Sequence, residues 1–325
     1  MNISRRTILA AGIGMLAPNL ARAQSSFPVR PLKMVVPFAA GGPTDFIIRL
    51  LADPLAGNLK QTVVIENRTG AAGNIGAVAV AQSEADGYTL LHSTVAMLAV
   101  NPILYPSASF NPMRDFTTIA TTASLPNVLV VNPLTTNVSS VADLIALAKS
   151  KPGGLTYATF GAGSSPHILG ALFQKLTGIE AVPIPYRGSA PALTDVIGGR
   201  VDMLFDSITT SAEQVKAGTV RALAVTSSER APQLPDVPTM KEIGFAGFDL
   251  SFWFSIQVPA ATPEATITRL QSALYDTMSQ QSFADALRLR GAEPLIVPRE
   301  QLKDYVARES ERWTRVATEI GLKPL

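Results

Sequence analysis

The sequence predicts an α/β protein with two lobes, built on mostly parallel sheets around a ligand cleft. Three observations support this prediction: apolar strand-like segments alternate with amphipathic helical ones, the series occurs twice, and the C-terminal part is mainly helical. We expect one lobe from residues 24–132 plus 251–325 and the other from residues 133–250. The chain would then cross between lobes near Asn132 and near Ser251.

The first series begins with an apolar strand at residues 32–38. A helix should follow, because apolar side chains recur at helical spacing at Phe46, Ile47, Leu50, Leu51 and Leu55. Pro43 suits the first helical position, where its missing N–H costs nothing. Pro54 should kink or split this helix. Further strands are expected at residues 62–66 and 88–92.

The second series predicts strands at residues 128–131, 156–159, 182–186, 201–205 and 221–226. Helices should lie between them. One is expected at residues 141–149, with Ser139 or Ser140 as its N-terminal cap. Another should follow the loop at residues 161–165, because apolar side chains again recur at helical spacing.

The N-terminus is typical of an export signal, predicted at residues 1–23. Arg5 and Arg6 supply a positive segment, residues 8–17 are a short apolar run, and Ala21-Arg22-Ala23 fits a cleavage site. The run is too short to span a bilayer, which needs about 20 apolar residues. The paired arginines resemble a twin-arginine signal, but the general secretory route stays open. We expect a periplasmic protein.

Charge and cysteine content exclude several classes of protein. Removing the signal takes away Arg5, Arg6 and Arg22, which changes the formal net charge from +2 to −1. The basic isoelectric point therefore gives no support for nucleic-acid binding. The chain has no cysteine, so disulfides, thiolate nucleophiles and cysteine-ligated metals are excluded.

Catalytic residues are not expected either. Ser164, Ser165 and His167 are close together, but no Gly-x-Ser-x-Gly turn surrounds them. A serine and a histidine two residues apart at a helix start would also point in different directions. The other histidine, His92, ends a strand and is interpreted as structural or cleft-lining. The sequence has no metal-binding or nucleotide-binding signature, so we expect no cofactor.

Three loops of small residues stand out at strand-to-helix junctions: residues 38–45, 69–74 and 161–166. Each places backbone N–H groups and hydroxyls at a helix N-terminus, where the partial positive charge suits an anion. Such loops line the carboxyl ends of parallel strands, where α/β folds bind ligands. One loop alone would indicate a tight turn. Three of them, on both lobes, predict a cleft for a small anion.

Several of these segments resemble one protein family, the extracytoplasmic solute receptors of tripartite tricarboxylate transporters, or Bug family. The likeness runs in order from about Phe27 to the C-terminus. It is carried by Pro31 to Asp45 (PLKMVVPFAAGGPTD), Val64 to Arg68, Gly70 to Gly76, Asp86 to Leu91, Gly161 to His167, Pro185 to Gly188, Pro191 to Asp195, Gly199 to Asp202 and Leu234 to Thr239.

The resemblance implies a type II periplasmic binding fold that captures one small organic carboxylate and delivers it to membrane transporter subunits. In this family, loop amides, hydroxyls and water commonly hold the carboxylate. Asp206 ends a strand, where the family often places a polar contact that helps select the ligand. We expect a monomer. The expected ligand-binding residues are Phe38, Ala39, Gly41, Gly42, Thr44, Ala72, Gly163, Ser164, Ser165, His167 and Asp206.

Some questions stay open at this level. Many relatives have Pro-Pro or Pro-Ala before the paired glycines, whereas Ala39-Ala40 stand here, and the ligand preference is therefore undecided. Di- and tricarboxylates, acidic amino acids and aromatic acids all remain candidates. A ligand sensor without a transport role would have the same fold. An exported hydrolase using Ser165 and His167 is the remaining alternative.

Overall fold

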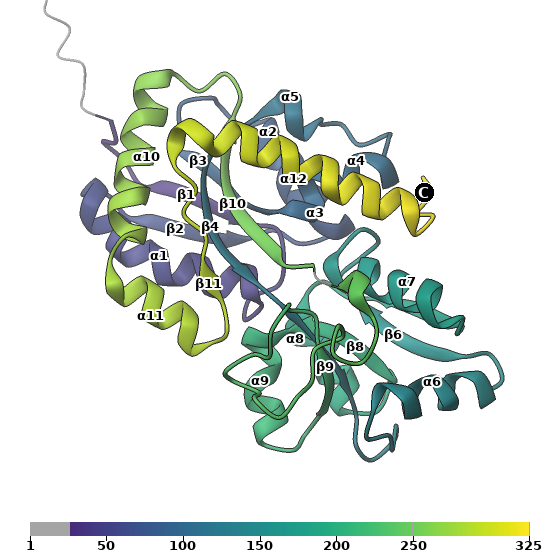
Figure 1. Ribbon diagram of the computed structural model, residues 1–325. Helices are drawn as coiled ribbons and strands as arrows, with labels where there is room; N and C mark the ends of the chain where they lie inside the picture. Colours follow the sequence, from purple (N-terminus) through teal and green to yellow (C-terminus); the bar gives the residue numbers. More distant parts are fainter. Residues whose placement is uncertain (1–26, 249, 325) are drawn as a thin grey trace, which may run out of the picture.

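The computed structural model describes residues 27–248 and 250–324. The predicted export signal, residues 1–23, lies outside this range. Two sheets form the framework of two lobes (Figure 1). The first has the strand order β11-β4-β10-β3-β1-β2, and the second has the order β7-β6-β8-β5-β9.

The first lobe contains the N-terminal and C-terminal segments. Its sheet consists of β1 (Leu32–Val36), β2 (Val63–Asn67), β3 (Thr89–Thr94), β4 (Phe116–Leu125), β10 (Phe252–Pro259) and β11 (Glu293–Pro294). Its helical segments are α1 (Pro43–Leu59), η1 (Ala71–Gly73), α2 (Asn74–Ala81), α3 (Val95–Ala99), α4 (Asn101–Leu104), α5 (Pro112–Asp115), α10 (Glu264–Met278), α11 (Gln281–Leu289) and α12 (Arg299–Glu319).

The second lobe is continuous in sequence. Its sheet consists of β5 (Asn127–Val131), β6 (Leu155–Thr159), β7 (Ala181–Pro185), β8 (Met203–Ser207) and β9 (Arg221–Val225). Its helical segments are α6 (Val141–Ser150), α7 (Ser165–Thr177), α8 (Ser189–Ile197), α9 (Ile208–Lys216) and η2 (Ala246–Phe248). Of the two caps considered for α6, the side chain of Ser140 accepts the hydrogen bond from the Asp143 N–H.

Both sheets are mixed, with a parallel part and an antiparallel part. Strands β2, β1 and β3 run parallel, as do β7, β6 and β8. The antiparallel pairs involve β10 and β5 in particular. These two strands follow directly on the crossings between lobes. Each therefore enters its sheet from the side of the other lobe, opposite in direction to the neighbouring strands.

The crossing between lobes comes one strand earlier than predicted. β4 belongs to the first sheet and β5 to the second, so only Pro126 connects them. The expected boundary at Asn132 therefore lies too late, because the strand at 127–131 pairs with β8 and β9 and not with the first sheet. The return crossing leads into β10 at Phe252, next to the expected Ser251.

Two other features differ from the prediction. α1 is a single helix from Pro43 to Leu59, and it contains Pro54 without being split. The ring of Pro54 is exposed and lies on the solvent side of the helix. The long strands β4 and β10 were not predicted, although they are central in the first sheet and are almost entirely buried.

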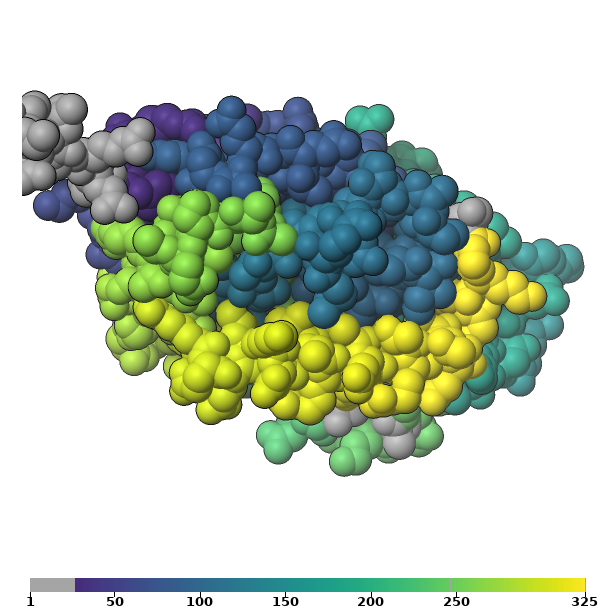
Figure 2. Space-filling view, turned by 90° about the horizontal axis from the view of Figure 1, so that it is seen from above, coloured from purple at the N-terminus to yellow at the C-terminus, as the bar shows by residue number. Residues whose placement is uncertain are grey.

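A hydrophobic core joins the two lobes. It contains Phe173 and Phe205 from the second lobe together with Phe252 and Trp313 from the first. The rings of Phe252 and Trp313 lie 4.5 Å apart between centroids. Figure 2 shows α12 running along the first lobe and ending beside the second. There Lys175 Nζ donates a hydrogen bond to the carbonyl oxygen of Glu319.

Polar contacts also connect the lobes on the side of the loops. The Ala39 N–H donates to the carbonyl oxygen of Arg187 over 3.0 Å. The Tyr105 hydroxyl donates to the carbonyl oxygen of Ala162 over 3.1 Å. The lobes therefore stand closed on each other, with the predicted loops facing across the boundary.

Candidate ligand-binding site

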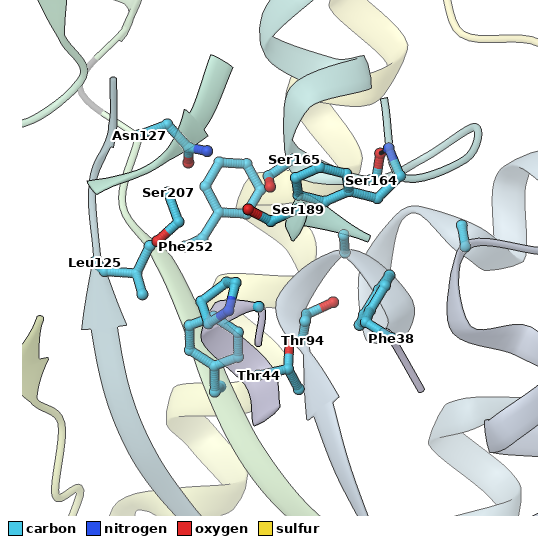
Figure 3. Close-up of a pocket in the computed structure, with 16 residues that line it drawn as sticks. Phe38, Thr44, Thr94, Leu125, Asn127, Ser164, Ser165, Ser189, Ser207 and Phe252 are labelled. Atoms are coloured by element: carbon cyan, nitrogen blue, oxygen red, sulfur yellow. Dashed lines mark hydrogen bonds between the residues drawn. The ribbon is translucent and has the colours of Figure 1, made fainter. Parts of the chain in front are cut away.

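A cavity lies between the lobes where the loops meet (Figure 3). Its volume is about 40 Å³. That is room for about three water molecules at roughly 10–15 Å³ each, so a larger ligand requires the lobes to part. Its walls come from both lobes: Phe38, Gly42, Pro43, Thr44, Ala72, Thr94, Ala96, Leu125, Asn127, Phe160, Ser164, Ser165, Ser189, Ser207, Phe252 and Phe254. None of these side chains is charged.

A second, open pocket of about 350 Å³ adjoins this cavity. The two share Phe38, Ala72 and Phe160, which therefore form the partition between them. Tyr186 and Arg187 line the open side.

Three helices of eight or more residues begin at the cavity wall: α1, α7 and α8. The N–H groups of Thr44, Ser165 and Ser189, in their first turns, have no hydrogen-bond acceptor among the described residues. None of the three helices has a side-chain cap. The positive ends of three helix dipoles thus converge on an uncharged cavity, which favours an anion.

Asp45 organises the first of the three loops. Its carboxylate accepts hydrogen bonds from the Gly41 N–H at 3.0 Å, from Arg49 Nε at 2.8 Å and from Asn67 Nδ2 at 2.9 Å. The same Asn67 amide donates to the carbonyl oxygen of Phe38. Burial by itself raises the pKa of Asp45, but the bonds from Arg49, Gly41 and Asn67 outweigh it and lower the pKa overall. An ionised Asp45 therefore ties the loop to the start of α1.

The second loop adopts an unusual backbone conformation. Gly70, Ala71, Ala72 and Gly73 all have positive φ, with φ of 52° at Ala72. Positive φ in alanine is strained, and such strain concentrates at functional sites. The Ala72 N–H has no acceptor among the described residues. A Cβ at Gly161 of the opposite lobe would lie only 2.9 Å from this nitrogen.

The third loop uses one of its two serines internally. The Ser164 hydroxyl donates to the carbonyl oxygen of Gly161 at 2.6 Å and accepts from the Phe160 N–H at 3.0 Å. Ser164 lines the cavity, but its single proton is already committed to the loop. The Ser165 hydroxyl has no hydrogen-bond partner among the described residues and also lines the cavity. Ser165 is therefore the better donor to a ligand.

Of the predicted site residues, six line the cavity: Phe38, Gly42, Thr44, Ala72, Ser164 and Ser165. The other five do not. The Ala39 N–H is bonded to Arg187, and the Gly41 N–H is bonded to Asp45. The Gly163 N–H donates to His167 Nδ1 at 3.2 Å. This bond uses the N–H of Gly163 and one ring nitrogen of His167.

Asp206 is the fifth of these, and it lies behind the cavity wall. Its side chain is fully buried and accepts hydrogen bonds from the hydroxyls of Ser189, Thr210 and Ser211. Burial raises the pKa of Asp206, while these hydroxyl bonds oppose the rise. Asp206 therefore lies next to the cavity and reaches it through Ser189, and its expected contact with the ligand stays a prediction.

Sequence reasoning missed several wall residues, among them Thr94, Asn127, Ser189 and Ser207. Two of the four, Thr94 and Ser207, share one signal because they end strands, and Ser189 has another because it begins a helix. The carboxyl ends of strands are where α/β folds bind ligands. Asn127 begins a strand, and no sequence signal distinguishes it.

Neither a metal site nor a membrane-spanning helix is present among the described residues. No group of three or more His, Asp or Glu residues within 27–248 and 250–324 could hold a metal ion. In the same part of the chain, no helix is both long and apolar enough to cross a membrane.

Two α/β lobes closed over a cavity between them are the architecture of a type II periplasmic binding protein. Residues 47–322 match the family model described as "Tripartite tricarboxylate transporter family receptor". The chain belongs to this family, and it is a receptor of the Bug type.

Three relatives support this assignment. Protein BugT from Bordetella pertussis is 39% identical over 317 residues, which cover 97% of this chain and 96% of BugT. The solved structure of R. palustris Rpa4515 with adipate is 38% identical, with a TM-score of 0.87, and the match covers 92% of this chain and 100% of that one. MatC from Rhodopseudomonas palustris, solved with bound malate, is 32% identical with a TM-score of 0.83, covering 89% and 99%.

Proposed function

We propose that this protein captures a small organic carboxylate between its lobes and delivers it to the membrane subunits of a tripartite tricarboxylate-type transporter. The observation that carries the proposal is the convergence of α1, α7 and α8 on the cavity, with the N–H groups of Thr44, Ser165 and Ser189 unpaired. Relatives with bound adipate and malate support the same class of ligand.

The wall chemistry explains how a carboxylate could bind without a salt bridge. A carboxylate oxygen accepts hydrogen bonds only, and the cavity offers unpaired N–H groups and the free hydroxyls of Thr44 and Ser165. Hydrogen bonds to a charged group contribute about 1.5–3 kcal/mol each in protein interiors. The apolar rings of Phe252 and Phe254 complete the wall and support a carbon chain or ring.

The site of action follows from the sequence and the family. The predicted signal at residues 1–23 supports export, and receptors for membrane transporters work on the outer side of the inner membrane. We infer a periplasmic monomer that meets its transporter with the ligand enclosed.

The hydrolase alternative lacks a nucleophile and base in contact. His167 Nδ1 accepts a hydrogen bond from the Gly163 N–H. The Ser165 hydroxyl makes no hydrogen bond to His167 within the part of the chain that the structure describes. A catalytic serine requires a base within hydrogen-bond reach.

The test is a thermal-shift screen of the mature protein against organic acids, followed by mass spectrometry of any ligand that co-purifies. A ligand that binds only the folded state raises the melting temperature by mass action. We expect at least one carboxylate to raise it in proportion to the logarithm of its concentration. If no member of a panel of di-, tri-, aromatic and amino acids raises it, the proposal is wrong.

A further inference from the structure

Asn127, at the start of β5, lines the cavity and carries a buried hydrogen-bond acceptor without a partner among the described residues. Its Nδ2 donates to the carbonyl oxygen of Phe205 at 3.0 Å. Turning the amide over would place two oxygens face to face, so this bond determines the orientation. The Oδ1 atom is buried and has no partner among the described residues. Asn127 therefore offers an unsatisfied acceptor in the wall.

The side chain of Ser189, at the start of α8, is also an acceptor, because Asp206 takes its hydroxyl proton. Its Oγ lies 2.7 Å from Asp206 Oδ1, in a side chain that is 2% exposed. The same Oγ lies 3.0 Å from Thr210 Oγ1, whose own hydroxyl bonds to Asp206. A carboxylate only accepts, so the shorter contact directs the hydroxyl proton of Ser189 to Asp206, which is not a residue of the cavity wall. The other carboxylate oxygen accepts from Thr210 and Ser211, both at 2.6 Å. What remains on Ser189 Oγ for a ligand is lone-pair electrons.

The two acceptors flank the end of one strand. Asn127 pairs with Ser207 across the β5–β8 ladder, and Asp206, which holds Ser189, is the next residue of β8. Figure 3 places Asn127 and Ser207 on the side of the cavity away from Phe38 and Ser164. The unpaired backbone donors of the cavity are the N–H groups of Thr44, Ser165 and Ser189, so at Ser189 only the side chain is an acceptor. The wall thus offers side-chain acceptors at Asn127 and Ser189 beside its backbone donors.

We propose that Asn127 and Ser189 select carboxylates that carry a hydrogen-bond donor, a hydroxyl or an ammonium group, over the same acids without one. This inference rests on the proposed function and names the ligand class of that site. A second carboxylate would be repelled by two lone pairs, and a methylene would leave the Asn127 oxygen buried without a partner. A hydroxyl or an ammonium group satisfies both. Asp206 acts as a positioning residue, through Ser189.

The experiment measures dissociation constants by calorimetry for acids that differ at one carbon atom. The matched sets are succinate, malate and aspartate, then glutarate, 2-hydroxyglutarate and glutamate, then benzoate and 4-hydroxybenzoate. In whichever set binds, the donor-bearing member should bind about tenfold more tightly than the parent acid, because an unmet buried acceptor is costly. Comparing the hydroxyl and ammonium members then identifies which donor the site takes.

Two variants assign the preference to its residues. Ser189→Ala and Asn127→Leu each remove one acceptor, and each should reduce the preference severalfold, mainly by weakening the donor-bearing acid. Ser255→Ala is the matched control: its hydroxyl is equally buried, bonds to Ser93 and does not line the cavity. The preference should survive in that control.

The outcomes separate this inference from the proposed function. If the parent acid binds as tightly as its hydroxyl and ammonium derivatives, the selection is wrong while carboxylate capture stands. If the preference persists undiminished in both Ser189→Ala and Asn127→Leu, these residues do not cause it. If no acid of these sets or of the thermal-shift panel binds, the proposed function itself fails.

Discussion

His92 Nδ1 lies 3.0 Å from the carbonyl oxygen of Thr44, at the point where α1 meets the cavity. The other ring nitrogen lies 3.1 Å from the Thr122 hydroxyl. A carbonyl only accepts, so Nδ1 carries the proton, and Nε2 accepts from Thr122. The ring is fully buried and stacks on Phe254. His92 is thus a neutral support beneath the first turn of α1.

This support makes stability depend on pH. Burial lowers the pKa of His92 to about 3, while the unfolded chain keeps the ordinary value of 6.5. As pH falls below 6.5 the unfolded state takes up a proton that the folded state does not. Stability is therefore fully present above pH 6.5 and is lost progressively as pH falls toward 3. The contribution lost between pH 7 and pH 5 is about 2 kcal/mol.

Denaturant unfolding at several pH values tests this, with His92→Gln as the variant. The variant should be less stable at pH 7 and should lose less stability on acidification. His167→Gln is the comparison, since its ring is only partly buried and should change the slope less. If the free energy of unfolding changes with pH equally in the wild type and in His92→Gln, His92 does not cause the pH dependence.

Gly161→Ala should hinder closure of the lobes. The new Cβ would lie 2.9 Å from the Ala72 nitrogen across the boundary, at a φ of +101°. Gly153→Ala is a matched control, because its φ is +81° but nothing lies within 4 Å of its Cβ. Both variants incur backbone strain of about 1–3 kcal/mol. Only Gly161→Ala should also weaken ligand binding and enlarge the radius of gyration measured by X-ray scattering; equal effects would contradict the contact.

Ser164→Ala and Ser165→Ala should act on different quantities. Ser164 is bonded within its loop, so its loss should reduce folding stability by about 1–3 kcal/mol. Ser165 has no such bonds, so its loss should leave the melting temperature of the free protein nearly unchanged. It should instead weaken carboxylate binding by about tenfold, the value of one hydrogen bond to a charged group. Calorimetry measures carboxylate binding by both variants, and thermal unfolding measures their stability. The assignment is wrong if Ser164→Ala weakens binding and Ser165→Ala lowers stability.

Asp45→Asn should disorder the first loop. The side chain of Asp45 is 3% exposed and is the acceptor for Gly41, Arg49 and Asn67. An uncharged amide cannot accept from all three, so we expect a loss of about 1–3 kcal/mol in stability together with weaker binding. Asp115→Asn is the control, because the Asp115–Arg114 pair is more exposed and solvent weakens its contribution to stability. Similar losses in both would show that Asp45 has no special role.

Much of the fold could be predicted because local signals were strong. Gly42-Pro43 and Ser164-Ser165-Pro166 mark helix starts, and both helices begin there. β4 and β10 escaped prediction because their pairing is entirely nonlocal, with Ile256 opposite Ala120. These strands also lack the alternation of apolar and polar residues that marks a half-exposed strand, because both faces of each strand are covered. The crossing at Pro126 was misplaced for the same reason.

The candidate site divides along similar lines. Loop residues such as Thr44 and Ser165 could be predicted as wall residues, because the neighbouring residues indicate that a helix begins there. Asn127 could not be predicted as a wall residue. Its place depends on Phe205 and Ser207, which lie beside it only when β5 pairs with β8. The expected contact of Asp206 with the ligand stays a prediction, and the sequence did not indicate that Ser189 would lie between Asp206 and the cavity.

The partition formed by Phe38, Ala72 and Phe160 has a kinetic consequence. A molecule enclosed behind it leaves only when the lobes part, so its residence time depends on the frequency of that motion. The bonds from Ala39 to Arg187 and from Tyr105 to Ala162 must break each time. Every ligand therefore shares the same upper limit on its rate of release, however weakly it binds the wall. The frequency with which the lobes part therefore sets how long a bound molecule stays in the protein.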